Sequence, residues 1–204
     1  MEGGEFVEKL KRCGWVKGNR WNMLYHDDEW GVPVHDDRKL FEFLILEGSQ
    51  AGLSWLTILK RREAYREAFD NFDFERVAFY NDEKIESLMN NKEIIRNRRK
   101  IEAAVNNARR FIEIVDSCGS FDTYIWSFVK HKTIQNTWEC QGDVPSETDI
   151  SREMSRDLKK KGFKFVGPTI CYAFMQATGM VNDHETGCFR YRDIQEYGEK
   201  NKRL

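Results

Sequence analysis

Apolar residues recur at intervals of three and four along most of the chain, a spacing typical of amphipathic helices. Ser, Asp and Asn precede many of these runs and glycines follow them, as expected at helix starts and ends. The pattern predicts eight helices, over residues 37–48, 54–69, 73–80, 82–90, 96–117, 120–130, 151–161 and 168–178. No stretch is rich in strand-forming residues, so the predicted fold class is all-α.

Three polar stretches interrupt this pattern. Residues 133–148 form one long connection, which we interpret as a surface excursion between two helical lobes. Residues 15–33 are rich in Trp and acids but poor in aliphatic side chains, so we expect a loop there. The C-terminal residues 195–204 are polar enough to fray.

The composition narrows the class of protein. Of the 204 residues 40% are hydrophobic and 13% aromatic, which is enough for a packed core and excludes intrinsic disorder. The mean hydropathy is −0.70, and no apolar run approaches the ~20 residues that a membrane span needs. The start MEGGEFVEKLKR lacks the apolar core of a secretion signal. We therefore expect a cytoplasmic protein whose five cysteines form no disulfide framework.

The charges balance overall but not locally. The chain has 33 Lys and Arg against 34 Asp and Glu, so its net charge gives no sign of a nucleic-acid partner. Residues 27–47 carry seven acids and two bases, whereas residues 92–110 carry seven bases and two acids, and residues 151–164 six bases and two acids. Such a chain is strongly dipolar, although each run is also compatible with a solvated helix face.

The last of these basic runs leads into a short loop between two predicted helices. Ser151 is expected to cap the first helix and Gly162 to end it, while Pro168 is expected to open the second. The loop, residues 162–167, combines aromatic anchors with glycines, and the free N–H groups at the start of the second helix can bind phosphate. A plain αα-hairpin between core helices is the alternative, but the surrounding lysines, Lys164 among them, favour phosphate.

Two Cys and two His residues near the ends of the chain have metal-ligand chemistry. Cys13 and His26 lie near the N-terminus, and His184 and Cys188 lie near the C-terminus. Together they would complete a closed tetrahedral shell, which suits structural zinc, although scattered Cys and His are more often ordinary core or surface residues. One shared metal would fasten the chain ends together and close a loop of over a hundred residues.

Aromatic residues and one carboxylate suggest a binding cleft. Four of the six tryptophans fall in the first 55 residues, namely Trp15, Trp21, Trp30 and Trp55. They either fill the core or, with Tyr25, wall a cleft for a flat heterocycle. Glu47 follows the apolar run LFEFLIL and is either a surface residue at a helix end or a partly buried carboxylate for a cationic or amino-bearing base. Asp27, Asp28 and Glu29 are expected to be solvated or to cap a turn.

Several motifs occur in an order that resembles a known family. They are CGW from Cys13, YHDDEWGVP from Tyr25, FEFLILEGSQAGLSW from Phe41, IIRNRRKI from Ile94, WSF from Trp126, GFKFVGPTICYAFMQA from Gly162, and VNDH from Val181 on to Cys188. Together they resemble the DNA-3-methyladenine glycosylase I family of the helix-hairpin-helix superfamily, over about residues 13–188.

The resemblance implies a monomeric, two-lobed helical glycosylase that removes N3-methyladenine from double-stranded alkylated DNA and leaves an abasic site, without lyase chemistry. It also implies one structural Zn²⁺, held by Cys13, His26, His184 and Cys188. Glu47 takes the place of the catalytic, base-recognising carboxylate, and the base-binding rings are those of Tyr25, Trp30 and Trp55. The hairpin, about residues 151–179, is expected to contact DNA through Lys164, Val166, Gly167 and Thr169.

The match has departures and limits. Only Val166 and Gly167 keep the usual glycine pattern of the hairpin. Relatives with broader substrates place a catalytic Asp after the second hairpin helix, where we expect Asn182 here, so Asp183 receives no catalytic role. Residues 13–188 are expected to form the glycosylase domain, with residues 1–12 as an extension and 189–204 as a tail.

The chemistry of the implied substrate needs few ionisable groups. N3-methylation makes the adenine cationic, so the base leaves as a neutral molecule without a strong general acid. Two other classes of protein fit the same residues: a DNA-binding protein whose pocket holds bases without excising them, and a zinc-stapled interaction module. Glu47 in an aromatic cleft argues against the interaction module. Only a measurement of turnover separates a glycosylase from a DNA-binding protein that holds bases without excising them.

Overall fold

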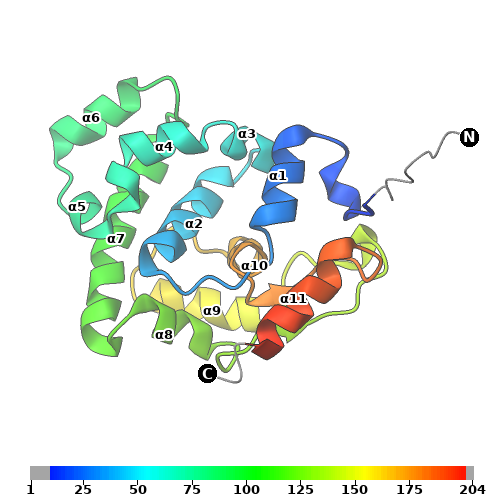
Figure 1. The fold of residues 1–204 in the computed structure, drawn as a ribbon. Coiled ribbons are helices and arrows are strands. Elements are labelled where there is room, and N and C mark those ends of the chain that lie inside the picture. The colour runs from blue at the N-terminus through cyan, green and yellow to red at the C-terminus, as the bar shows by residue number, and fades with distance from the viewer. Residues whose placement is uncertain (1–9, 201–204) are drawn as a thin grey trace, which may run out of the picture.

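The computed structural model describes residues 10–200, with the backbone alone for residues 198–200, and is mostly helical (Figure 1). The helices are α1 (Arg20–Asp28), α2 (Asp37–Gln50), α3 (Trp55–Leu59), α4 (Arg62–Ala68), α5 (Phe74–Ala78), α6 (Asp82–Asn90), α7 (Arg98–Cys118), α8 (Phe121–Ser127), α9 (Asp149–Lys160), α10 (Pro168–Ala177) and α11 (Phe189–Lys200), with short 3-10 turns η1 (Gly14–Val16), η2 (Asp70–Phe72) and η3 (Gln141–Asp143). A small parallel pair, β1 (Ile134–Gln135) and β2 (Val181–Asn182), accompanies them. The chain was predicted to be all-α; its mostly helical character is confirmed, whereas the small strand pair was not predicted.

Helices α2 and α10 lie in the middle of the molecule and carry the pocket described below. Figure 1 shows α1 and α11 on one side of them and α5–α7 on the other. Leu40, Phe41 and Leu46 of α2 are fully buried, and Phe111 of α7 stacks on Phe121 of α8 with ring centroids 4.0 Å apart. Large aromatic side chains therefore fill much of the core, which fixes α2 in place.

Helix starts follow the expected capping chemistry. The side chain of Asp36 accepts a hydrogen bond from the backbone N–H of Lys39 at the start of α2. Helix α9 begins two residues earlier than expected, because Thr148 is its N-cap and Ser151 lies inside its first turn, where the two residues bond each other reciprocally. The expected cap at Ser151 is therefore wrong.

Two helices are missing from the sequence-based expectation. Helix α1 lies in the stretch expected to be a loop; Asn19 caps it, and its buried face consists of Tyr25 and His26 instead of aliphatic side chains. Helix α11 extends to Lys200, and its residue Ile194 is 1% exposed. The prediction that the chain frays from residue 195 is therefore wrong for residues 195–200. Residues 1–9 and 201–204, from the expected extension and tail, lie outside the described residues.

Two further segments differ from expectation. The predicted helix over residues 54–69 is two helices, α3 and α4, which meet at Lys60 and Arg61. The polar connection over residues 133–148 contains β1 and η3, and its residues 141, 144 and 145 line the pocket. Among the described residues, no helix is both long and apolar enough to cross a membrane.

Candidate active site and metal-ligand cluster

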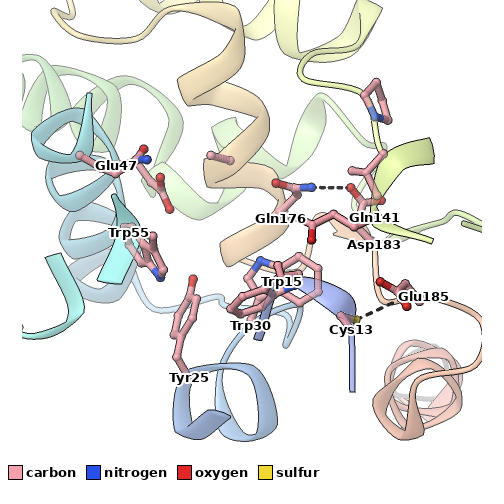
Figure 2. Close-up of a pocket in the computed structure, with 14 residues that line it drawn as sticks. Cys13, Trp15, Tyr25, Trp30, Glu47, Trp55, Gln141, Gln176, Asp183 and Glu185 are labelled. Carbon is pink, nitrogen blue, oxygen red and sulfur yellow. Dashed lines mark hydrogen bonds between the residues drawn. The ribbon is translucent and has the colours of Figure 1, made fainter. Parts of the chain in front are cut away.

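A pocket of about 310 Å³ lies between α1, α2, α3 and α10 (Figure 2). It brings together the four residues predicted to bind a base: Glu47 near the end of α2, Tyr25 of α1, Trp55 at the start of α3, and Trp30 just after α1. The lining is completed by Cys13, Trp15, Gln50, Gln141, Val144, Pro145, Ala173, Gln176, Asp183 and Glu185. Residues far apart in sequence therefore share one cavity.

Aromatic rings form two walls of this pocket. The rings of Tyr25 and Trp55 lie 5.3 Å apart at 49°, and those of Trp15 and Trp30 lie 5.2 Å apart in an edge contact. The indole N–H groups of Trp15 and Trp55 are buried, and no residue within 10–200 accepts a hydrogen bond from them. A planar ligand with acceptor atoms would both stack on these rings and satisfy the unpaired donors.

Glu47 is a buried carboxyl group in the lining of the pocket. Its side chain is 4% exposed, and no described residue donates a hydrogen bond to its carboxyl group. Burial raises the pKa of Glu47 from its ordinary 4.5 to about 8. The pKa of the Tyr25 hydroxyl is also raised, first by burial and then by the neighbouring Glu47. A cationic ligand would favour the ionised carboxylate and offset the cost of its burial.

The four candidate metal ligands form one buried cluster. One ligand atom from each of Cys13, His26, His184 and Cys188 lies within 4.8 Å of all the others. The Cys188 sulfur is 3.4 Å from His26 Nε2 and 3.7 Å from His184 Nδ1, and the Cys13 sulfur is 3.6 Å from His184 Nδ1. Zinc bond lengths of 2.3 Å to sulfur and 2.0–2.1 Å to nitrogen give a tetrahedral edge of about 3.6 Å. The cluster therefore fits one zinc ion.

The outer nitrogen of each imidazole has its own partner. His26 Nδ1 lies 2.8 Å from a carboxylate oxygen of Asp27, which also accepts hydrogen bonds from Arg12. His184 Nε2 lies 3.0 Å from the carbonyl oxygen of Trp30. Such partners hold each ring with its other nitrogen facing the ligand cluster, as in metal sites. The expectation that Asp27 is merely solvated or caps a turn is therefore wrong.

Glu29 likewise has a specific partner. Both of its carboxylate oxygens accept hydrogen bonds from Arg62, which also donates to Glu42. Arg62 is buried at 6% exposure, so this network anchors the segment after α1 to α4 and α2. The segment that carries Trp30 is thus fixed by ion pairs that local sequence cannot reveal.

The loop between α9 and α10 is held against α7. The backbone N–H and carbonyl of Lys164 bond the side chain of Asn107, while the Lys164 side chain is exposed. Thr169 is also exposed, and Gly167 opens α10 without a side-chain cap, so the first N–H groups of the helix have no intrahelical acceptor. Val166 differs, since its side chain is buried and its carbonyl accepts from Ser155. Its side chain anchors the loop from inside.

Asn182 and Asp183 have distinct surroundings. Asn182 is fully buried and bonds Gln135, the carbonyl of Tyr191 and the N–H of His184, so it joins strand β2 to its neighbours. Asp183 lines the pocket and accepts hydrogen bonds from four side chains. Asp183 was given no catalytic role from the sequence, and its four donors, spread over residues 136–176, give no local signal that it lines the pocket.

The chain matches known proteins along most of its length. The family model described as methyladenine glycosylase matches residues 15–191. DNA-3-methyladenine glycosylase 1 of Escherichia coli is 48% identical over 182 residues, 89% of this chain and 97% of that protein. A crystal structure of 3-methyladenine DNA glycosylase I superposes with a TM-score of 0.86 at 49% identity, covering 88% of this chain and 98% of that one. A variant enzyme in complex with 3-methyladenine gives 0.85 at 39% identity, over 87% and 96%.

Proposed function

This chain belongs to the methyladenine glycosylase family, and we infer from this that it hydrolyses the N-glycosidic bond of 3-methyladenine in alkylated DNA. The products are the free base and an abasic site. The observation that carries the inference within the molecule is Glu47, a buried carboxyl group that has no hydrogen-bond partner among the described residues and lies in a pocket walled by aromatic rings. We propose that the enzyme acts on double-stranded DNA, as a monomer in the cytoplasm.

The roles of the pocket residues follow from the charge of the substrate. Methylated at N3, the adenine is a cation while it is still bonded to the sugar, and it leaves as a neutral base. The damaged nucleotide is extruded into the pocket, where Tyr25, Trp30 and Trp55 stack on or enclose the base. Entry of the cation draws Glu47 into its ionised form, which binds the base by charge and hydrogen bonding. Water then adds to the sugar carbon as the base departs and gives up one proton to solvent, so no strong general acid is required.

We also propose that the Cys/His cluster holds one structural zinc ion. Four buried donors at tetrahedral spacing and a satisfied outer partner for each imidazole support the assignment. Zinc would supply a fixed joint between the chain ends and no catalytic step, since all four of its positions are filled by side chains. Trp30 lies 4.7 Å from His184, so this joint also supports one wall of the pocket.

The loop between α9 and α10 is the proposed contact with the DNA backbone. Lys164 and Thr169 are exposed, and the uncapped start of α10 offers N–H groups to a phosphate. Val166 contributes by anchoring the loop, and Gly167 leaves open space where a Cβ would otherwise stand. Phe165 of the same loop reaches Gly48, the neighbour of Glu47, so the proposed DNA contact and the pocket share one packed unit.

The deciding experiment measures release of labelled 3-methyladenine from methylated duplex DNA by the purified protein. Trp55→Ala should lower free-base affinity and single-turnover excision together, because stacking contributes ~1–3 kcal/mol per base. Glu47→Gln should impair the same two measurements while nonspecific duplex affinity stays nearly constant. Trp21→Ala is the matched control, because Trp21 is 47% exposed and lies outside the pocket. Excision by Glu47→Gln at the parent rate would refute the role of Glu47.

A further inference from the structure

We propose that Gln176, oriented by Asp183, presents a hydrogen-bond acceptor to the pocket and selects bases that carry an exocyclic amino group. This inference rests on the proposed function of the pocket and adds a specificity residue to it. Gln176 lies on α10 and lines the pocket. In Figure 2 its amide nitrogen faces Asp183, and its oxygen points toward the side of the pocket where Glu47 lies.

The orientation of the Gln176 amide follows from the chemistry of its partner. Asp183 Oδ2 accepts from Gln176 Nε2 at 2.7 Å and from the Tyr172 hydroxyl at 2.6 Å. An ionised carboxylate has only acceptors, so it can bond the amide only through its nitrogen. The amide oxygen must therefore turn away from Asp183, toward the cavity. A serine or water at the same place would impose no such direction.

The carboxylate of Asp183 is held in place by hydrogen bonds to both of its oxygens. Its Oδ1 atom accepts from Asn136 Nδ2 at 2.6 Å and from Trp138 Nε1 at 2.8 Å, so both carboxylate oxygens have two donors each. These four bonds use the acceptor capacity of the group. Asp183 is 3% exposed, and its four hydrogen bonds make it a positioning residue for Gln176.

The consequence for recognition is a second acceptor in the pocket besides Glu47. The amino group of adenine donates hydrogen bonds, whereas the corresponding position of a purine without that group does not. A site built to accept a hydrogen bond discriminates strongly against a ligand that lacks the donor, because its own acceptor is left unpaired. Gln176 thus contributes to base identity without any charge, and Glu47 contributes the response to the cation.

The test compares two free bases, 3-methyladenine and 3-methylpurine, which differ by the amino group alone. Calorimetric titration should show that the parent prefers 3-methyladenine. Gln176→Met keeps the length of the side chain but loses the acceptor, so it should weaken 3-methyladenine binding roughly five- to tenfold and leave 3-methylpurine binding nearly unchanged. An unchanged ratio between the two bases in Gln176→Met would overturn the proposal.

Asp183 is tested by two variants and one spectrum. Asp183→Asn frees the Gln176 amide to rotate and should reduce the preference, whereas Tyr172→Phe removes a neighbouring donor, leaves the Gln176 bond intact and should preserve the preference. In the ¹⁵N spectrum of the parent, the Gln176 side-chain amide, assigned by its loss in Gln176→Met, should show a proton protected from exchange. Free exchange would overturn the role of Asp183 whether or not Asp183→Asn folds.

Base excision and the role of Gln176 can be refuted independently of each other. If Gln176→Met loses the preference for 3-methyladenine over 3-methylpurine but the parent releases no base from methylated DNA, the proposed excision is refuted and the role of Gln176 is supported. If the parent excises the base but the preference for 3-methyladenine persists in Gln176→Met, the proposed excision is supported and the role of Gln176 is refuted.

Discussion

At the scale of single residues, Glu47 combines burial with the absence of a protein hydrogen bond from any described residue. Its pKa of about 8 in the folded protein compares with an ordinary 4.5. Between these values the unfolded chain has lost the proton that the folded protein keeps, so stability falls as pH rises through this window. The residue proposed to recognise the base is therefore a source of instability in the empty enzyme.

Glu47→Gln should remove this pH dependence. The amide keeps the shape of the side chain but cannot ionise, so the variant should match the parent near pH 4.5 and exceed its stability at pH 8 by a few kcal/mol, on the order that such a pKa shift implies. Urea unfolding at both pH values measures the difference. The exposed Glu153→Gln serves as the control, and a parallel pH trend in parent and Glu47→Gln would contradict the burial argument.

Whether a site residue could be predicted from the sequence depends on whether its role shows in the local pattern or arises from a tertiary contact. Glu47 and the Cys/His set could be selected from residue type and local pattern, and the structure brings each set together. The Asp27 and Gln176 contacts could not, because their partners Arg12 and Asp183 are fixed only by the tertiary fold. A carboxylate in an acidic run looks solvated until its partner is known.

At the scale of elements, helices whose buried face is marked by regularly spaced aliphatic residues could be predicted, whereas α1 and α11 could not. Helix α2 has a continuous apolar face, so its bounds differ from the expectation by two residues at one end. Helix α1 buries an aromatic ring and an imidazole, which standard apolar patterns do not count. Helix α11 depends on the packing of Tyr191 and Ile194, a property of the whole fold.

Lys164→Glu tests the loop between α9 and α10 as the DNA contact. Its backbone is held by Asn107, so reversing the exposed charge should leave the loop in place. Duplex affinity should fall equally for all sequences, and the slope of log K against log salt should decrease in size by about 0.9, the value for one phosphate contact. Lys132→Glu, at an exposed site on another loop, is the control. Identical affinity and slope in Lys164→Glu and parent would remove this contact.

The turn after α10 is a second element with a sharp steric requirement. Gly179 has φ of +72°, and a Cβ there would stand 2.5 Å from the backbone of Val32 and Pro33. Gly179→Ala should therefore destabilise the protein by more than the ~1 kcal/mol that a left-handed Ala costs alone. Gly119→Ala isolates the conformational cost, because Gly119 has φ of +85° with nothing within 4 Å. Equal losses in chemical denaturation of the two variants would exclude the clash.

At the scale of the whole molecule, the ligand cluster connects segments from near both ends of the chain. Besides the Cys and His contacts, the backbone N–H of Phe189 donates to the carbonyl of Lys11 at 2.9 Å. A metal bound at this joint would add its binding free energy to folding, because the four ligands meet only in the complete fold. The sequence supplied the ligand types, whereas their meeting depends on every helix between them.

Metal removal should therefore lower global stability. Elemental analysis of the purified protein should give about one zinc per chain, and a strong chelator should release it and lower the Tm. Cys188→Ser should act like the chelator, whereas Cys140→Ser, at an exposed cysteine outside the cluster, should retain the metal. A metal-free protein with the parent Tm would remove the ligand assignment.

The position of this cluster also sets an order of events during synthesis. Chains emerge from the ribosome N-terminus first, and early segments begin to fold while later ones are still being made. Cys13 and His26 appear early, but their partners are His184 and Cys188, and the ring of Trp30 packs against His184. The pocket wall formed by Trp15 and Trp30 therefore lacks the packing contact with His184 until translation has passed residue 188. The pocket residues of α1, α2 and α3 are therefore made long before α10, which supplies further lining residues, and before His184, which packs against Trp30.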